Sequence, residues 1–205
     1  EAVKYIVRNW KKWCGLRVER RQKWVEDWEK HLLEEASEDA KSKRKMHPLQ
    51  LGVDVISEMA DDDWLVFDGG NTHFWNEIAV NISGWRGKKL GGIMHPGNYS
   101  LLGVGISFGI SAKAAHPDKN VVVISGDGAF LSGGLSIESA FQEGLPIIVV
   151  IDNDGGLDCI SQQQERLFAN GKHYATDFRD IPFHSMFEGL GGYQGSTFSV
   201  DQLLE

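Results

Sequence analysis

The stretch that decides the fold is Val121-Val122-Val123-Ile124-Ser125-Gly126-Asp127-Gly128. Four consecutive β-branched residues give a run that is apolar on both faces, which is typical of a strand buried inside a parallel sheet. The Ser-Gly-Asp-Gly that follows closes the strand in a turn, because glycine and aspartate favour turns. A second run of this kind spans 147–151 and leads into Asp152-Asn153-Asp154-Gly155-Gly156.

Helical patterns alternate with these strands. We expect helices over 49–59, 101–115 and 136–143, and an earlier strand over 64–67 that leads into the turn 68–71. Buried strands that alternate with helices predict an α/β fold: a doubly wound, mostly parallel sheet with helices on both faces.

Residues 1–47 differ from the rest of the chain. They hold 13 Lys/Arg, 9 Asp/Glu and one of the 24 glycines, whereas 48–205 carry 8 basic and 20 acidic side chains. Trp24, Trp28 and Leu32 share one face of a long amphipathic helix predicted over 17–45. We interpret 1–47 as the helical tail of a preceding domain, or a linker, whose tryptophans pack against another domain.

The larger part, 48–205, reads as a domain of its own that is truncated at its C-terminus, because a helix start at Ser199 is followed by only about one turn of chain. Its acidic balance argues against a nucleic-acid partner. The sequence has no apolar run of 18 residues and only two cysteines, Cys14 and Cys159. These features predict a cytoplasmic protein without a membrane span or a disulfide framework.

Three glycine-rich loops leave the predicted strand ends, at 69–72, 126–129 and 153–156. In parallel α/β sheets, ligands bind beyond the carboxyl ends of the strands. Glycines let backbone N–H groups approach phosphate oxygens, and aspartate supplies the oxygen ligands that Mg²⁺ prefers. Asp127 and Asp154 lie 27 positions apart at successive strand ends. The sequence therefore predicts a phosphorylated ligand held through a divalent cation.

The spacing of these loops resembles a known family. Gly126-Asp127-Gly128, followed about 25 residues later by Asn153-Asp154, resembles the thiamine diphosphate signature of the acetolactate synthase-like superfamily. This superfamily also includes 2-hydroxyacyl-CoA lyases and oxalyl-CoA decarboxylases. The segments 61–72, 101–105 and 144–146, with Trp75, fall in the family's order. The resemblance runs from about Pro48 onward and implies the C-terminal diphosphate-binding domain, with thiamine diphosphate and Mg²⁺ as cofactors.

The resemblance implies a role for each matching residue. Asp127 and Asp154 would bind the metal through their side chains and Gly156 through its carbonyl group. The diphosphate would meet a set of loop residues: Gly70, Asn71, Thr72, Gly126, Gly128 and Ala129. Leu102 would support the bent form of the cofactor, and the Ser100 carbonyl would accept a hydrogen bond from its amino group.

Two positions depart from the family pattern. Asp154 stands where a second asparagine is usual, which keeps a metal ligand and adds one negative charge. Gln163 stands where acetolactate synthases carry a substrate-selecting tryptophan, so strict acetolactate synthase activity is not predicted. Gln163 and His95 are candidate substrate contacts. For His95 and the nearby His73, a hydrogen-bonded structural role is the alternative.

Gly103, Gly105 and Gly109 form a GxGxxxG pattern that is also found in dinucleotide-binding loops. Such loops follow a strand, and the preceding segment 95–99 does not read as one. We therefore predict that these glycines serve close helix packing.

The resemblance implies a lyase, decarboxylase or carboligase that acts on 2-oxo acids or 2-hydroxyacyl-CoA thioesters. The pattern of Gly103-Val104-Gly105 with Phe108 resembles 2-hydroxyacyl-CoA lyases and oxalyl-CoA decarboxylases, whereas 162–168 and 173–183 resemble acetolactate synthases. In this family the activating glutamate lies on a pyrimidine-binding domain, which no part of this sequence resembles. We therefore expect a pyrimidine-binding domain or subunit as partner, in a homo- or hetero-oligomer. The alternative is a non-catalytic cofactor-binding or regulatory subunit.

Overall fold

The computed structural model describes residues 23–24, 26–34, 37, 46–168 and 171–190. The chain divides into two compact units, 1–47 and 48–205. In the first unit, 26–34 are helical, and the exposed rings of Trp24 and Trp28 stack with centroids 5.7 Å apart. Most of the helix predicted over 17–45 lies outside the described residues, so its role as the tail of another domain stays a prediction.

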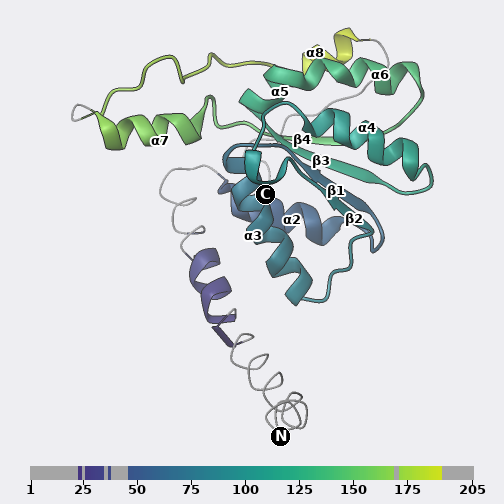
Figure 1. The fold of residues 1–205 in the computed structure, drawn as a ribbon, viewed down its shortest axis with the longest axis horizontal. Coiled ribbons are helices and arrows are strands. Elements are labelled where there is room, and N and C mark those ends of the chain that lie inside the picture. The colour runs from purple at the N-terminus through teal and green to yellow at the C-terminus, as the bar shows by residue number, and fades with distance from the viewer. Residues whose placement is uncertain (1–22, 25, 35–36, 38–45, 169–170, 191–205) are drawn as a thin grey trace, which may run out of the picture. The chain divides into compact units, whose positions relative to one another are not determined.

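The second unit is built on a parallel sheet (Figure 1). Its strands are β1 (Trp64–Phe67), β2 (Gly92–Met94), β3 (Val121–Gly126) and β4 (Ile148–Asp152), in the order β2-β1-β3-β4. All three pairings are parallel. Residues 121–125 of β3 are all buried, as the β-branched run predicts for an inner strand. The predicted parallel α/β fold is confirmed.

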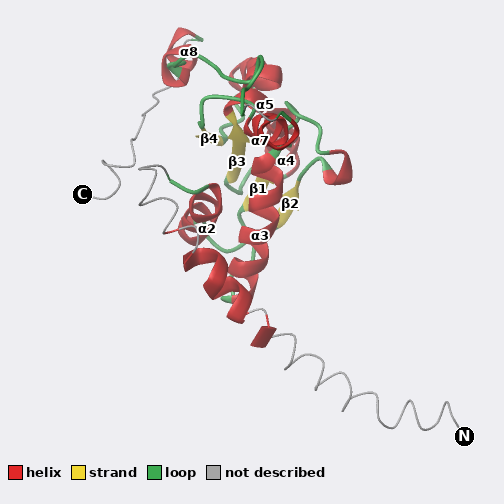
Figure 2. Cartoon of the chain, turned by 90° about the vertical axis from the view of Figure 1, so that its left-hand side faces the viewer, coloured by secondary structure: helices red, strands yellow, loops and turns green. Residues whose placement is uncertain are grey.

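The helices of this unit lie on both faces of the sheet. They are α2 (Pro48–Glu58), α3 (Asn71–Trp85), α4 (Gly105–Ala115), α5 (Asp127–Gly133), α6 (Ile137–Gln142), α7 (Asp158–Leu167) and α8 (Phe183–Gly189), with short 3₁₀ turns η1 (Gly97–Tyr99) and η2 (Gly134–Ser136). The chain moves from β1 to β2 in one direction and from β2 to β3 and β4 in the other. Right-handed crossovers then put α3 on one face, and α4, α5 and α6 on the other, as Figures 1 and 2 show.

This change of direction places a topological switch point between β1 and β3, at the carboxyl edge of the sheet. A buried apolar cluster lies on the α4–α6 face, where the Phe130 ring meets Phe183 edge-on at 5.6 Å and Phe187 at 5.3 Å. None of the described helices has both the length and the apolar character to cross a bilayer.

The helix predicted over 101–115 begins later, at Gly105. Ser100 and Gly103 both have positive φ, 45° and 86°, which helical backbone excludes. The predicted packing role of the glycines is confirmed for Gly109, where an added Cβ would lie 2.4 Å from Val123 Cγ2. For Gly105, an added Cβ would lie 2.8 Å from Asp68 Oδ2.

Two glycine-to-alanine changes should therefore have opposite effects on stability. Gly109→Ala forces a methyl group into Val123, and such overpacking costs about 1–3 kcal/mol. Gly84→Ala in α3 meets nothing within 4 Å and should stabilise by about 0.4–1 kcal/mol, since alanine restricts the unfolded chain. Urea unfolding measures both values, and a Gly109→Ala variant as stable as Gly84→Ala would contradict the packing.

Candidate functional site

The loops after β1, β3 and β4 contact one another at the carboxyl edge of the sheet. Asp127 Oδ2, at the end of β3, accepts a hydrogen bond of 3.0 Å from the Gly155 amide after β4. Asn71 Nδ2, after β1, donates to Asp158 Oδ2 at 2.8 Å. An added Cβ on Gly126 would lie 3.0 Å from Thr72 Oγ1. The structure thus brings together the three glycine-rich loops that the sequence singled out.

Asp127 is the central side chain of these loops. It is 2% exposed and begins α5, and its Oδ1 accepts from the Gly128 amide at 2.7 Å. Burial raises the pKa of its carboxyl group, and backbone hydrogen bonds from Gly128 and Gly155 partly offset that rise. A buried carboxylate is costly unless hydrogen bonds or a cation compensate its charge.

Further carboxylates lie around Asp127. Burial, with repulsion from Asp127 and Asp158, raises the pKa of Asp152 to about 6. Partial desolvation, with repulsion from Asp127, Asp158 and Asp152, raises the pKa of Asp154 to about 7. No cationic group among the described residues offsets either rise. These hard oxygen donors fit a divalent cation such as Mg²⁺, which would neutralise the cluster.

The loop after β4 is fixed by its own backbone. Gly155 has φ 83°, and the Gly156 amide donates to Asp154 Oδ1 at 3.1 Å. An added Cβ on Gly156 would lie 2.5 Å from the Thr176 carbonyl oxygen, so only glycine allows this approach. Asp154 and Gly156 are therefore adjacent to Asp127, while their metal-binding roles stay predictions.

The loop after β1 packs on the segment 100–102. Gly70, with φ 81°, donates its amide hydrogen to Ser100 Oγ at 2.9 Å. Leu102 is half-exposed at this edge, and its Cδ2 would lie 3.3 Å from an added Cβ on Gly70. The Ser100 carbonyl oxygen lies against Gly69, where an added Cβ would be 2.3 Å away. The cofactor contacts expected of Ser100 and Leu102, and of Gly128 and Ala129 in the first turn of α5, stay predictions.

The two candidate substrate contacts, Gln163 and His95, interact with residues outside the carboxylate cluster. Gln163 is exposed on α7, and its Nε2 lies 3.8 Å from Cys159 Sγ on the same helix. The far end of α7 is joined to the next loop by a 2.8 Å contact between Glu165 and His173, which raises the pKa of His173. The His95 ring lies beside His73, with His73 Nε2 3.0 Å from His95 Nδ1.

Sequence reasoning missed the role of Asp68. This buried carboxylate accepts amide hydrogens from Gly69, Gly103 and Gly105 at 2.8–2.9 Å, and the Ser125 hydroxyl lies 3.3 Å away. Its place directly after a buried strand was the available signal. Asp152 and Asp158 were also missed as members of the carboxylate cluster, although both flank the predicted loop 153–156.

Comparisons with known proteins agree with this arrangement. The family model "Thiamine pyrophosphate enzyme, C-terminal TPP binding domain" matches residues 69–205. Human 2-hydroxyacyl-CoA lyase 2 is 27% identical over 195 residues, which are 90% of this chain and 30% of the lyase. Acetolactate synthase of Bacillus subtilis is 28% identical over 190 residues, which are 92% of this chain and 32% of the synthase. The chain thus spans about a third of the length of these curated relatives.

A solved structure shows the same fold. The thiamine diphosphate-dependent 4-hydroxybenzoylformate decarboxylase of Rhodococcus jostii RHA1 superposes with a TM-score of 0.62 at 24% sequence identity. The match covers 78% of this chain and 29% of the decarboxylase.

Proposed function

Because this chain belongs to the thiamine pyrophosphate enzymes through their C-terminal TPP-binding domain, we propose that it binds thiamine diphosphate through Mg²⁺ at the carboxyl edge of its sheet. One observation carries the proposal. Asp127 is buried, is tied to the loop after β4 by the Gly155 amide, and lies among carboxylates whose pKa values are raised to about 6 and about 7. A divalent cation held by these carboxylates would relieve this repulsion and would offer a positive charge to the diphosphate.

We assign the loops separate tasks. Asp127, Asp154 and the Gly156 carbonyl group would hold the cation. The diphosphate would contact the loop residues on either side: Gly70, Asn71, Thr72, Gly126, Gly128 and Ala129. Leu102 would support the cofactor from the segment that packs on Gly70. The bound cofactor supplies an electron sink for breaking or making a carbon–carbon bond next to a carbonyl group.

The reaction that we propose is lyase, decarboxylase or carboligase chemistry on 2-oxo acids or 2-hydroxyacyl-CoA thioesters. The names of the relatives, a 2-hydroxyacyl-CoA lyase and an acetolactate synthase, support this class. The activating glutamate would come from a pyrimidine-binding domain or subunit, within a homo- or hetero-oligomer. His95 and Gln163 remain proposed substrate contacts.

A non-catalytic cofactor-binding or regulatory subunit is the second candidate. No part of the sequence resembles the pyrimidine-binding domain that carries the activating glutamate, and a chain that acts without such a domain would have this role. The first step of the test is affinity purification of the chain, to recover a pyrimidine-binding polypeptide. The recovered assembly is then assayed with a panel of substrates for CO₂ release and for acyl-CoA cleavage. Turnover in that assembly supports the enzyme, and cofactor binding without any turnover supports the subunit.

Calorimetric titration of thiamine diphosphate into the chain tests the binding proposal. We expect binding in millimolar Mg²⁺ and a loss of affinity of at least about 100-fold in EDTA, because a charge-assisted contact contributes up to about 3 kcal/mol. Thiamine, which lacks the diphosphate, is the matched ligand and should show no Mg²⁺ dependence. Equal affinity for thiamine diphosphate with and without the chelator would overturn the proposal.

A further inference from the structure

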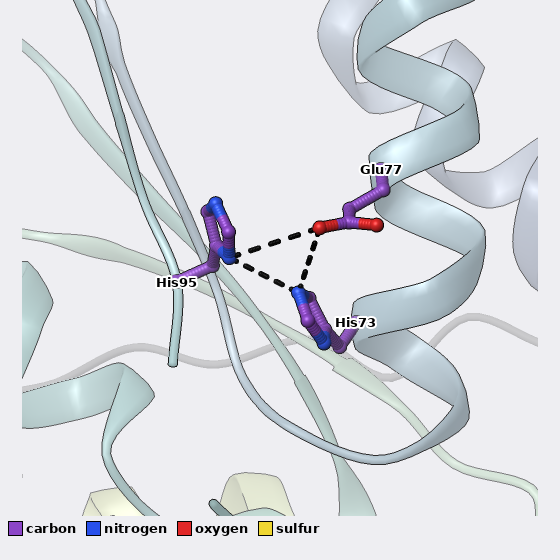
Figure 3. Close-up of side chains that lie close together, drawn as sticks. All are labelled: His73, Glu77 and His95. Atoms are coloured by element: carbon purple, nitrogen blue, oxygen red, sulfur yellow. Dashed lines mark hydrogen bonds and ion pairs between the residues drawn. The ribbon is translucent and has the colours of Figure 1, made fainter. Parts of the chain in front are cut away.

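Three potential metal ligands converge outside the carboxylate cluster (Figure 3). His73 Nε2 lies 3.0 Å from His95 Nδ1 and 3.1 Å from Glu77 Oε1. His95 Nδ1 lies 4.0 Å from the same Glu77 oxygen. Two imidazole nitrogens and one carboxylate oxygen therefore face one another, each from a different side chain.

The fold holds these groups in place before any ligand binds. His73 and Glu77 are four residues apart on α3, so both side chains lie on one face of that helix. His95 directly follows β2, whose register with β1 pairs Val66 with Met94. The buried Phe67 ring stacks on His95 at 5.0 Å and on His73 at 5.6 Å, which fixes the planes of both imidazoles.

The hydrogen bonds at this cluster show which nitrogen lacks a proton. The Gly97 amide lies 3.2 Å from His95 Nδ1, and because an amide can only donate, that nitrogen accepts and carries no proton. His73 Nε2 then faces two acceptors, His95 Nδ1 and Glu77 Oε1, with a single N–H to share between them. One proton thus occupies a space that is lined by three electron-pair donors.

We propose that His73, Glu77 and His95 form a binding site for one transition-metal ion of the Zn²⁺ class. Tetrahedral Zn²⁺ with bonds of about 2.0–2.1 Å sets neighbouring ligand atoms about 3.3 Å apart, close to two of the three separations here. The third separation, 4.0 Å between His95 Nδ1 and Glu77 Oε1, shortens when the half-exposed Glu77 side chain rotates toward His95. The ion displaces the shared proton and replaces the 3.2 Å hydrogen bond from the Gly97 amide to His95 Nδ1. A water molecule fills the fourth coordination position of the ion.

The donor set separates this site from the proposed cofactor site. Imidazole nitrogen suits Zn²⁺, Co²⁺, Ni²⁺ and Cu²⁺, whereas the all-oxygen cluster around Asp127 suits Mg²⁺. The inference does not rest on the proposed cofactor binding, because none of the three side chains belongs to the glycine-rich loops; His95 alone is also a proposed substrate contact. The two sites should therefore respond to different ions and to different substitutions.

Titration of Zn²⁺ into the full chain, with millimolar Mg²⁺ present to occupy the oxygen cluster, tests the site. We expect one Zn²⁺ per chain, and about a 100-fold loss of affinity in His95→Gln and in Glu77→Gln. Co²⁺ in place of Zn²⁺ should give visible absorption bands in the wild type that both variants lose. Because Glu77 and His95 are partly exposed, these variants are better tests than replacement of the buried His73.

His173→Gln is the matched control. Its carboxylate partners contact opposite ring nitrogens, Glu165 at Nε2 and Asp177 at Nδ1. Both carboxylates and a single His173 nitrogen therefore cannot bind the same ion. Zn²⁺ affinity should be unchanged in this variant and in Asp127→Asn. Absence of Zn²⁺ binding in the wild type, or binding that survives in both His95→Gln and Glu77→Gln, would leave a hydrogen-bonded triad and overturn the proposal.

Discussion

Asp127→Asn is expected to abolish Mg²⁺-dependent binding of thiamine diphosphate while the chain stays folded. The substitution removes a carboxylate that is buried and is joined to the loops after β3 and β4. A cation that loses a charged oxygen ligand holds the diphosphate more weakly, and we expect a fall in affinity of at least about 100-fold. The fall should vanish in EDTA, where neither protein holds the cation.

The folded state should tolerate this change. Asparagine is nearly isosteric with aspartate, and its carbonyl oxygen can still accept from one of the two loop amides. The substitution also removes a charge that burial disfavours and that repels Asp152 and Asp154. We therefore expect a free energy of unfolding, without metal, within about 1 kcal/mol of wild type, since one hydrogen bond is exchanged for relief of repulsion.

The control is Asp118→Asn, which removes the same charge from an exposed turn before β3, at the opposite edge of the sheet. Calorimetric titration of the cofactor at fixed Mg²⁺ should give wild-type affinity for this variant. If Asp127→Asn binds the cofactor as tightly as Asp118→Asn does, the assignment of the metal site is wrong.

The parts of the fold that were predicted from sequence are those encoded locally. The run 121–124 is apolar on both faces and β-branched, so its environment must be an inner strand, and the turn residues after it mark the site edge. The same logic placed β1 correctly and β4 to within one residue. Family resemblance then named the loop residues, which the structure brings together.

The parts that sequence missed depend on distant partners. β2 is a three-residue edge strand with an exposed Ile93 and no apolar run, and only pairing with β1 defines it. The late start of α4 follows from the hydrogen bonds that Gly103 and Gly105 donate to Asp68, more than 30 positions away. The contact between His73 and His95 was not predicted, because nothing in a spacing of 22 residues indicates that their rings meet.

Asp68→Ala is expected to destabilise the chain more than any other single change proposed for it. The carboxylate is 1% exposed and accepts hydrogen bonds from three backbone amides that belong to two separate segments. Without it, buried N–H groups have no acceptor, and each such group costs about 1–3 kcal/mol. With partial relaxation and entry of water, we expect a loss of about 3–5 kcal/mol in the free energy of unfolding.

The Asp68→Ala change should also disorder the proposed cofactor site, because Asp68 fixes the start of α4 and with it the segment that carries Leu102. Hydrogen exchange of the Gly103 and Gly105 amides should quicken in the variant even where it is still folded, since these amides lose their acceptor. Asp54→Ala, on the exposed face of α2, is the control and should change stability by no more than about 0.5 kcal/mol. Equal urea midpoints for the two variants would mean that the loops after β1 and before α4 are held together by packing alone, and the buried carboxylate would then need another explanation.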